Sequence, residues 1–193
     1  VIRDIPWAGS PHNMIVSTKK ASKMLKANVA EQLFSIIGKP AEALAEKCID
    51  SAASISGRVV LRAARQENNA LELIGLMLSK EVLMASLPEG FQPIAWFQID
   101  DFAEAIGLKS RRKADILALC AGEEDGVSVL DMYVVESKFI ERNGFEAEKK
   151  RSFEQATETT SDLRDRIVLE NDVLNRGYWR SRLADLLIEH REF

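Results

Sequence analysis

Three charged side chains that could do chemistry lie in two short apolar segments of this chain. Asp115 belongs to the apolar run 114–120, and Glu136 and Lys138 belong to the run 129–139. Buried strands rarely contain charges unless the charges are paired or bind a metal ion. Carboxylates are oxygen ligands that suit magnesium, and a lysine can stabilise negative charge that develops during a reaction. These three residues therefore form the first candidate site.

The two apolar segments are predicted to form a β-hairpin with an acidic turn over residues 122–126. A turn centred at 124–125 sets Asp115 opposite Val134, and Glu136 is then its diagonal neighbour, about 7–8 Å away between α-carbons. Alternation with a period of two places the glutamate and the lysine on the same face of their strand. We therefore expect the two carboxylates to share one cation.

Asp115, followed by Glu136-Ser137-Lys138 on the next strand, resembles the PD-(D/E)xK nuclease superfamily of restriction-endonuclease-like proteins. In that superfamily two acids bind magnesium and the lysine assists hydrolysis of a phosphodiester. Ala114 stands where the family name has proline. A second acid-x-lysine triplet at 148–150 lies in a charged run that is typical of a solvated helix face, so only the first triplet lies on an apolar strand.

The resemblance implies a metal site formed by Asp115, Glu136 and the backbone carbonyl of Ser137. It implies Mg²⁺ or Mn²⁺ as the cofactor. Lys138 would then position or activate water and stabilise the phosphate.

Two further residues are site candidates by the same resemblance. Superfamily members often place a glutamate on the helix before the strands, and Glu72 holds that place, although an acid in the first turn of a helix is also favoured by the helix dipole. Gln155, on the helix after the strands, resembles the auxiliary residue that orients water or phosphate. The alternative for Gln155 is an ordinary surface glutamine.

Basic residues cluster in two places near these candidates. Arg111, Arg112 and Lys113 end two residues before Asp115, and Lys149 and Lys150 begin the helix that contains Gln155. They could be solvated surface residues, but beside a site for DNA they would supply sequence-independent attraction to phosphates.

Composition limits the other classes of function. The chain has 193 residues, a net charge of −4 and 46% hydrophobic residues, which is ordinary for a folded domain with one sizeable core. No apolar run reaches the length of a membrane span and no signal peptide is visible, so we expect a cytoplasmic protein without membrane contact. Two histidines and two cysteines cannot build a zinc site, and Cys48 and Cys120 are expected to be free thiols.

The pattern of apolar residues, caps and breakers predicts the order of elements. The lead-in over 1–16 is irregular or extended, the segment 57–65 favours a helix, and the helix that begins at Asn68 or Asn69 is a core helix. The remaining elements are helices over 18–37, 40–52, 145–167 and 171–191, and a strand over 92–100.

These elements predict an α/β fold with a restriction-endonuclease-like mixed β-sheet flanked by helices. Residues 1–66 would form an N-terminal helical extension, and residues 67–193 the nuclease core. Because both hairpin segments are apolar on both faces, we expect the hairpin in the middle of the sheet. The sequence begins with Val1 rather than Met, so we expect a processed product or a piece of a larger chain.

The predicted function is metal-dependent hydrolysis of DNA phosphodiester bonds in a bacterial restriction or anti-phage system. By fold-level analogy, an ATPase or translocase region would lie elsewhere in the same chain or in a partner chain. Homo-oligomerisation is left open. The alternative is a catalytically inactive nuclease-like module that binds a partner or nucleic acid.

Overall fold

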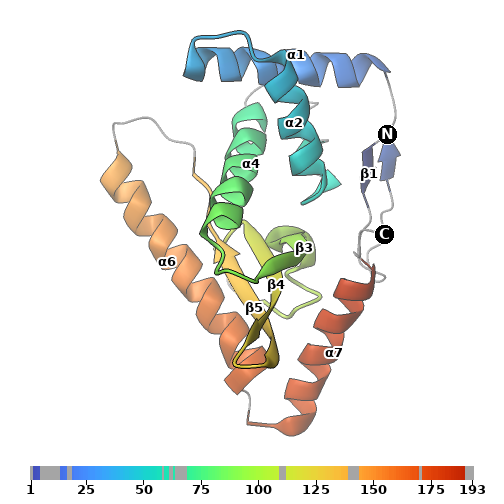
Figure 1. Ribbon diagram of the computed structural model, residues 1–193, viewed down its shortest axis with the longest axis vertical. Helices are drawn as coiled ribbons and strands as arrows, with labels where there is room; N and C mark the ends of the chain where they lie inside the picture. The colour runs from blue at the N-terminus through green and yellow to red at the C-terminus, as the bar shows by residue number, and fades with distance from the viewer. Residues whose placement is uncertain are drawn as a thin grey trace. The chain divides into compact units, whose positions relative to one another are not determined.

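The protein is described by a computed structural model, drawn in Figure 1, which covers residues 2–4, 14–16, 19–57, 59–60, 63, 69–108, 112–138, 144–169 and 171–189. Contacts between Cα atoms divide the chain into two compact units. Unit 1 is Val1–Ile5, Pro11–Ala85 and Ser137–Phe139, and unit 2 is Pro6–Ser10, Ser86–Glu136 and Ile140–Phe193. The helix before the strands therefore groups with unit 1, whereas the domain boundary at residue 66 stays a prediction.

Unit 1 is mostly helical. Two short strands pair antiparallel within the segment predicted as an irregular or extended lead-in, and the described residues of 57–63 are helical, as the sequence favours. The described elements of this unit are β1 (Ile2–Asp4), β2 (Met14–Val16), α1 (Lys19–Ile37), α2 (Glu42–Ala53) and α4 (Asn69–Ser86).

The apolar residues of α1 and α4 are only partly buried. In α1, Leu25, Val29 and Leu33 are buried, whereas Ile36 and Ile37 are each 45% exposed. On α4, Leu78 and Val82 are 46% and 65% exposed. Apolar residues occur on most sides of this helix, so their period does not by itself select the buried face. The buried hydrophobic residues of α4 are Ala70, Leu73, Ile74, Leu76, Met77 and Leu83.

Unit 2 contains an antiparallel sheet with strand order β3-β4-β5. The α/β class and the helices around the sheet are confirmed. The predicted mixed sheet is wrong for the described strands, because both pairings are antiparallel and β5 is an edge strand rather than a central one. The elements are β3 (Gln92–Gln98), α5 (Ile99–Phe102), β4 (Ile116–Glu124), β5 (Val127–Val135), α6 (Phe145–Arg164), the π-helical turn η1 (Asp165–Leu169) and α7 (Val173–Glu189).

The hairpin turn lies one residue later than predicted. Glu124 pairs with Val127, so the turn consists of Asp125 and Gly126, whose φ angles of 51° and 77° are both positive. Two positive φ angles are the requirement of a type I′ turn, for which Asp-Gly is a preferred sequence. A turn that shifts by one residue changes every cross-strand partner by two positions, and Val134 pairs with Leu117 rather than with Asp115.

One face of the sheet packs against α6, η1 and α7. The strand residues of this face alternate along each strand, as the pleat requires. The cluster includes Ala95 and Phe97 from β3, Leu117 and Leu119 from β4, and Leu163, Ile167, Leu183 and Leu186 from the helices, with Met132 and Val134 of β5 packed against it.

Two other sequence expectations concern the whole chain. Cys48 and Cys120 are both free and buried, as predicted, and burial raises the pKa of each thiol. Within the described residues, every helix is too short or too polar to cross a membrane.

The contact between Gly107 and Trp179 gives a test of how α7 is held. Gly107 has a φ of 72°, and a Cβ there would lie 2.3 Å from the Trp179 ring. We expect Gly107→Ala to lower the free energy of unfolding by about 1–3 kcal/mol more than Gly126→Ala does, since only the former adds overpacking to the backbone strain.

Gly126 is a matched control because its φ is 77° and a Cβ there meets nothing within 4 Å. Urea denaturation of both variants measures the difference. Equal losses of stability would contradict the close packing of Trp179 on Gly107.

Candidate functional site

The two acids of the candidate site lie at the same end of neighbouring strands. Ile116 pairs with Val135 in the last step of the β4–β5 ladder, so Asp115 comes directly before it and Glu136 directly after it. The regular ladder ends at this pair. The Asp115 amide donates to the carbonyl of Val135 rather than to Glu136, so the two acids lie at the same end of the strand pair without forming a regular cross-strand pair.

Glu136 follows the sheet face that packs on the helices. Phe97, Leu117 and Val134 form one row across this face. Alternation places Glu136, two residues after Val134, on the same face. At Asp115 the bond to the Val135 carbonyl interrupts the regular alternation, so its face is not given by the strand pattern.

Backbone hydrogen bonds fix Asp115 between its two neighbouring strands. Its amide donates to the carbonyl of Val135 at 3.1 Å, and its carbonyl accepts from the amide of Ile99 at 2.9 Å. These bonds hold the Asp115 backbone although the residue lies outside the regular ladder. The position of this acid relative to the end of β5 is thus set by the main chain.

Helix α6 holds the two residues that precede Asp115. The Gln155 side-chain amide donates to the Lys113 carbonyl. The Thr159 hydroxyl oxygen accepts from the Ala114 amide at 2.9 Å and donates to the Gln155 carbonyl at 2.9 Å. Gln155, predicted as an auxiliary catalytic residue, therefore binds the backbone next to the acid. Thr159 has no counterpart among the predicted residues.

The side of α6 that meets this segment is polar. Successive helical residues are about 100° apart, so Ser152, Gln155 and Thr159 share one face. Thr159 is 1% exposed. Ser152 has a buried hydroxyl oxygen for which the described part of the chain provides no hydrogen-bond partner. A buried hydroxyl of this kind is suited to bind an ordered water.

Both acids are half-buried. The two carboxylate oxygens of Glu136 are shielded from solvent. An ionised carboxylate loses hydration when it is buried, and hydrogen bonds or opposite charge must compensate.

Three other predicted site residues belong to unit 1. They are Ser137, Lys138 and Glu72, of which Lys138 and Glu72 are exposed. Gly75 of α4 permits the close approach of Ser137, because a Cβ at residue 75 would lie 2.8 Å from the Ser137 hydroxyl. Glu72 precedes Gly75 by one helical turn and so lies on the same side of α4.

The described residues near the two acids offer few protein ligands for a magnesium ion. Among the residues that the structure covers, no three or more His, Cys, Asp or Glu side chains gather into a group that could bind a metal ion. Glu72 is thus not part of such a group. Within unit 2 the donors at the end of the strand pair are the Asp115 and Glu136 carboxylates, and magnesium commonly keeps several waters beside one or two carboxylates.

The predicted DNA-binding residues differ in where they lie. Lys113 precedes the site directly and its carbonyl is held by α6, and Arg112 beside it is exposed. Lys150 projects from the side of α6 opposite Gln155 and lies 3.9 Å from the Glu154 carboxylate. Arg111 lies outside the described residues. Lys149 lies near the start of α6, with its ammonium 5.9 Å from the centroid of the Phe145 ring.

The role of Thr159 can be tested by two substitutions that differ in one group. Thr159→Val removes the acceptor of the Ala114 amide, and a buried donor left without a partner costs about 1–3 kcal/mol. We expect urea denaturation to show this loss and hydrogen exchange at the Ala114 amide to become faster. Thr159→Ser keeps the hydroxyl and is expected to keep the amide protected. Equal exchange rates in the two variants would contradict the role of the hydroxyl.

Comparisons of the chain with protein-family models, with curated protein sequences and with solved structures give no match. The resemblance to the PD-(D/E)xK superfamily therefore depends on the residues and elements described above, and the activity it implies is a proposal.

Proposed function

We propose that this protein is a metal-dependent nuclease that hydrolyses phosphodiester bonds of DNA. The observation that supports the proposal best is the position of two acids at the same end of adjacent strands, one of them with a desolvated carboxylate. The acid-x-lysine sequence that follows the edge strand supplies the third group. The sequence resemblance and the position of the two acids therefore support the same proposal of a shared cation.

Each group has a distinct role in the proposed reaction. Asp115, Glu136 and the Ser137 carbonyl would hold Mg²⁺ or Mn²⁺. When bound, the metal supplies a more acidic water and neutralises charge on the phosphoryl oxygens. The Lys138 ammonium would donate hydrogen bonds to the water or to a non-bridging phosphate oxygen, where negative charge increases in the transition state.

Helix α6 serves this site by fixing the main chain before Asp115. Gln155 and Thr159 bind the backbone at Lys113 and Ala114, so they are positioning residues in this proposal. A carboxylate on a held backbone binds a cation with less loss of conformational entropy. A role of this kind for Gln155 replaces direct orientation of water or phosphate.

The wider biological setting is part of the same proposal. A nuclease with a small site and no phosphate-binding glycine loop in its sequence would depend on another region for ATP-driven movement along DNA. We therefore place it in a restriction or anti-phage system with an ATPase or translocase in the same or a partner chain. The competing function is an inactive module that keeps the fold and binds a partner.

Substitutions at the three charged residues should impair the protein in different ways. Asp115→Asn and Glu136→Gln are expected to lose Mg²⁺ binding and cleavage together, because an amide is a poorer ligand for a hard dication. Lys138→Ala is expected to keep metal binding and to lower turnover about 100-fold. Isothermal titration with Mg²⁺ and cleavage of plasmid and single-stranded DNA measure the two properties.

Glu72→Gln is a control that distinguishes a two-carboxylate site from a larger one. Because Glu72 belongs to no metal-binding group in the described structure, its replacement should leave metal affinity within about 2-fold of wild type. Wild-type protein that binds DNA but cleaves nothing with Mg²⁺ or Mn²⁺ would favour the inactive module.

DNA binding should depend on the basic residues according to their positions. Each phosphate contact that is lost lowers the slope of log affinity against log salt by about 0.9 for duplex DNA. We expect this decrease for Arg112→Ala and Lys113→Ala, measured by fluorescence anisotropy over a salt series. Lys150→Ala should change the slope less, because this side chain lies on the far side of α6 and beside Glu154. A larger effect at Lys150 would contradict the proposed surface.

A further inference from the structure

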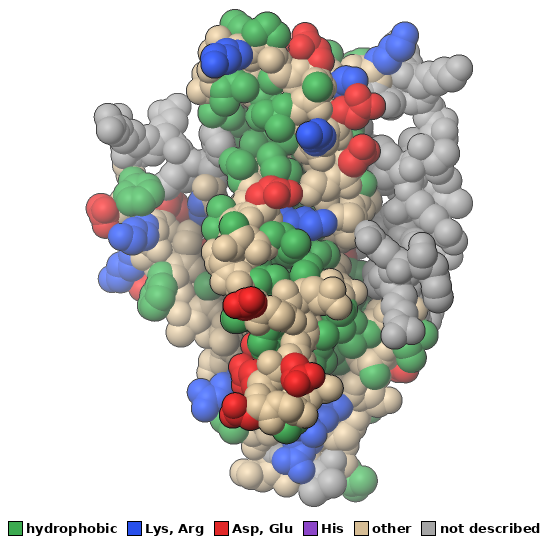
Figure 2. All heavy atoms as spheres, viewed as in Figure 1, with side chains coloured by type: hydrophobic (Ala, Val, Ile, Leu, Met, Phe, Trp, Pro, Cys, Tyr) green, Lys and Arg blue, Asp and Glu red, His purple; other side chains and the backbone are tan. Residues whose placement is uncertain are grey.

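The outer surface of α6 contains two aromatic rings that the fold does not use. Phe145 is 51% exposed and Phe153 is 73% exposed. Burying a phenylalanine is favourable by about 1.5–3 kcal/mol, so two exposed rings on a polar helix are unexplained by packing within the described structure. Figure 2 shows hydrophobic side chains exposed among basic and acidic ones on the surface that α6 forms.

A lysine lies between the two rings on the same side of the helix. Phe145, Lys149 and Phe153 are spaced by four residues each, which places them in one stripe about 12 Å long. The Lys149 ammonium lies 5.9 Å from the centroid of the Phe145 ring. We name these three residues the aromatic stripe.

Charges are distributed unevenly around α6. Three acids lie on the side of the helix away from the aromatic stripe, namely Glu154, Glu158 and Asp162. Two acids lie near the stripe in the first turn, Glu146 and Glu148. Glu148 is paired with Arg151, and Glu154 with Lys150. An anion at Lys149 therefore meets little repulsion from the middle of the helix.

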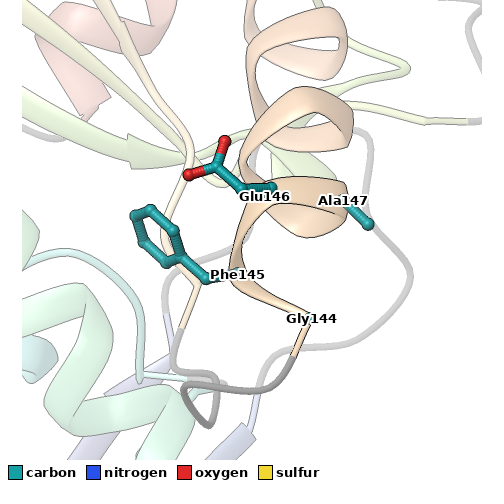
Figure 3. A pocket seen from close by; sticks show the side chains of 4 residues that line it. All are labelled: Gly144, Phe145, Glu146 and Ala147. Carbon is teal, nitrogen blue, oxygen red and sulfur yellow. The ribbon is translucent and has the colours of Figure 1, made fainter.

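An open hollow adjoins the first ring of the stripe. It measures about 570 Å³ and is lined, among the described residues, by Gly144, Phe145, Glu146 and Ala147. Figure 3 shows the Phe145 ring and the Glu146 carboxylate on one side of the helix start and Ala147 on the other. The Phe145 ring thus has free space beside it that a planar group could enter.

The other end of the stripe lies level with the candidate site. Phe153 precedes Gln155 by two residues, which is about 3 Å along the helix axis. Gln155 binds the carbonyl of Lys113, two residues before Asp115. Residues two apart in a helix differ by about 200°, so a linear ligand on the stripe would reach the level of this segment on the other side of α6.

We propose that the aromatic stripe binds a single-stranded segment of nucleic acid, with bases stacked on Phe145 and Phe153 and a phosphate on Lys149. Exposed aromatic rings with an interleaved cation are the recognition elements of single-strand binding, because unpaired bases expose their faces and duplex bases do not. The inference rests on the proposed function, since it names the form of substrate that the same site receives.

The test measures binding without cleavage. Fluorescence anisotropy with a labelled 20-nucleotide single-stranded DNA and the matching duplex, in chelator, separates affinity from metal chemistry. We expect tighter binding of the single strand, and a loss of about 5-fold or more for Phe153→Ala, as stacking contacts typically show. Lys149→Ala should lower the salt slope for the single strand by about 0.7.

Matched variants separate stacking from general effects. Phe153→Tyr keeps an aromatic face and should retain affinity, whereas Phe153→Leu keeps only apolar area and should weaken binding as Phe153→Ala does. Phe34→Ala removes a ring of similar exposure, 53%, from α1 in unit 1 and should leave affinity unchanged. Thermal unfolding of each variant checks that the fold is intact.

Several results would overturn the inference. These are tighter binding of the duplex, no binding of the single strand by wild type, or unchanged single-strand affinity in Phe153→Ala. A change of oligomeric state in Phe153→Ala with unchanged DNA binding would assign the stripe to a protein contact instead. Retained single-strand binding in a wild-type protein that neither binds Mg²⁺ nor cleaves would refute the proposed nuclease and leave the stripe as a binding surface.

Discussion

The candidate site depends on how the backbone of residues 113–115 is held. Hydrogen bonds reach this short segment from three elements: β5 accepts from the Asp115 amide, the residue after β3 donates to its carbonyl, and α6 binds the two preceding residues. Each of these contacts joins parts of the chain that are distant in sequence. An acid at the end of a strand would otherwise be free to turn away from its neighbour, and the enforced proximity of two carboxylates requires such support.

The same contacts explain why α6 can be so polar. In this helix only Thr159 and Leu163 are buried, so most of its surface gains nothing from apolar packing. Hydrogen bonds to the Asp115 segment and the Leu163 contact with the sheet core hold it instead. A helix attached through one narrow face leaves its other sides available, and this frees the positions of the two exposed rings and Lys149 for contact with a ligand.

The sequence was sufficient for most elements and for the placement of the acids, but not for their register. Apolar runs and Gly or Pro breakers located β3, β4, β5, α4 and α7 to within a few residues, because the local pattern determines them. The turn was misplaced although Asp125-Gly126 is a strong type I′ signal, and this one-residue error moved every cross-strand partner in the ladder by two. Thr159 could not be foreseen, since a threonine inside a helix has no local signature and its partner is Ala114, 45 residues away. Likewise, a helix as apolar all round as α4 does not reveal which face is buried.

The position of β5 reconciles a shielded carboxylate with access for a polymer. As the edge strand of the described sheet, β5 ends beside only one neighbour, β4, and the chain passes directly from Glu136 into the Ser137–Lys138 segment. At an edge, packing against the sheet face can exclude water from the acids on one side, while Lys138 remains exposed. Two carboxylates near each other repel, and a shared dication would relieve that repulsion, which is the physical basis of the metal site proposed above.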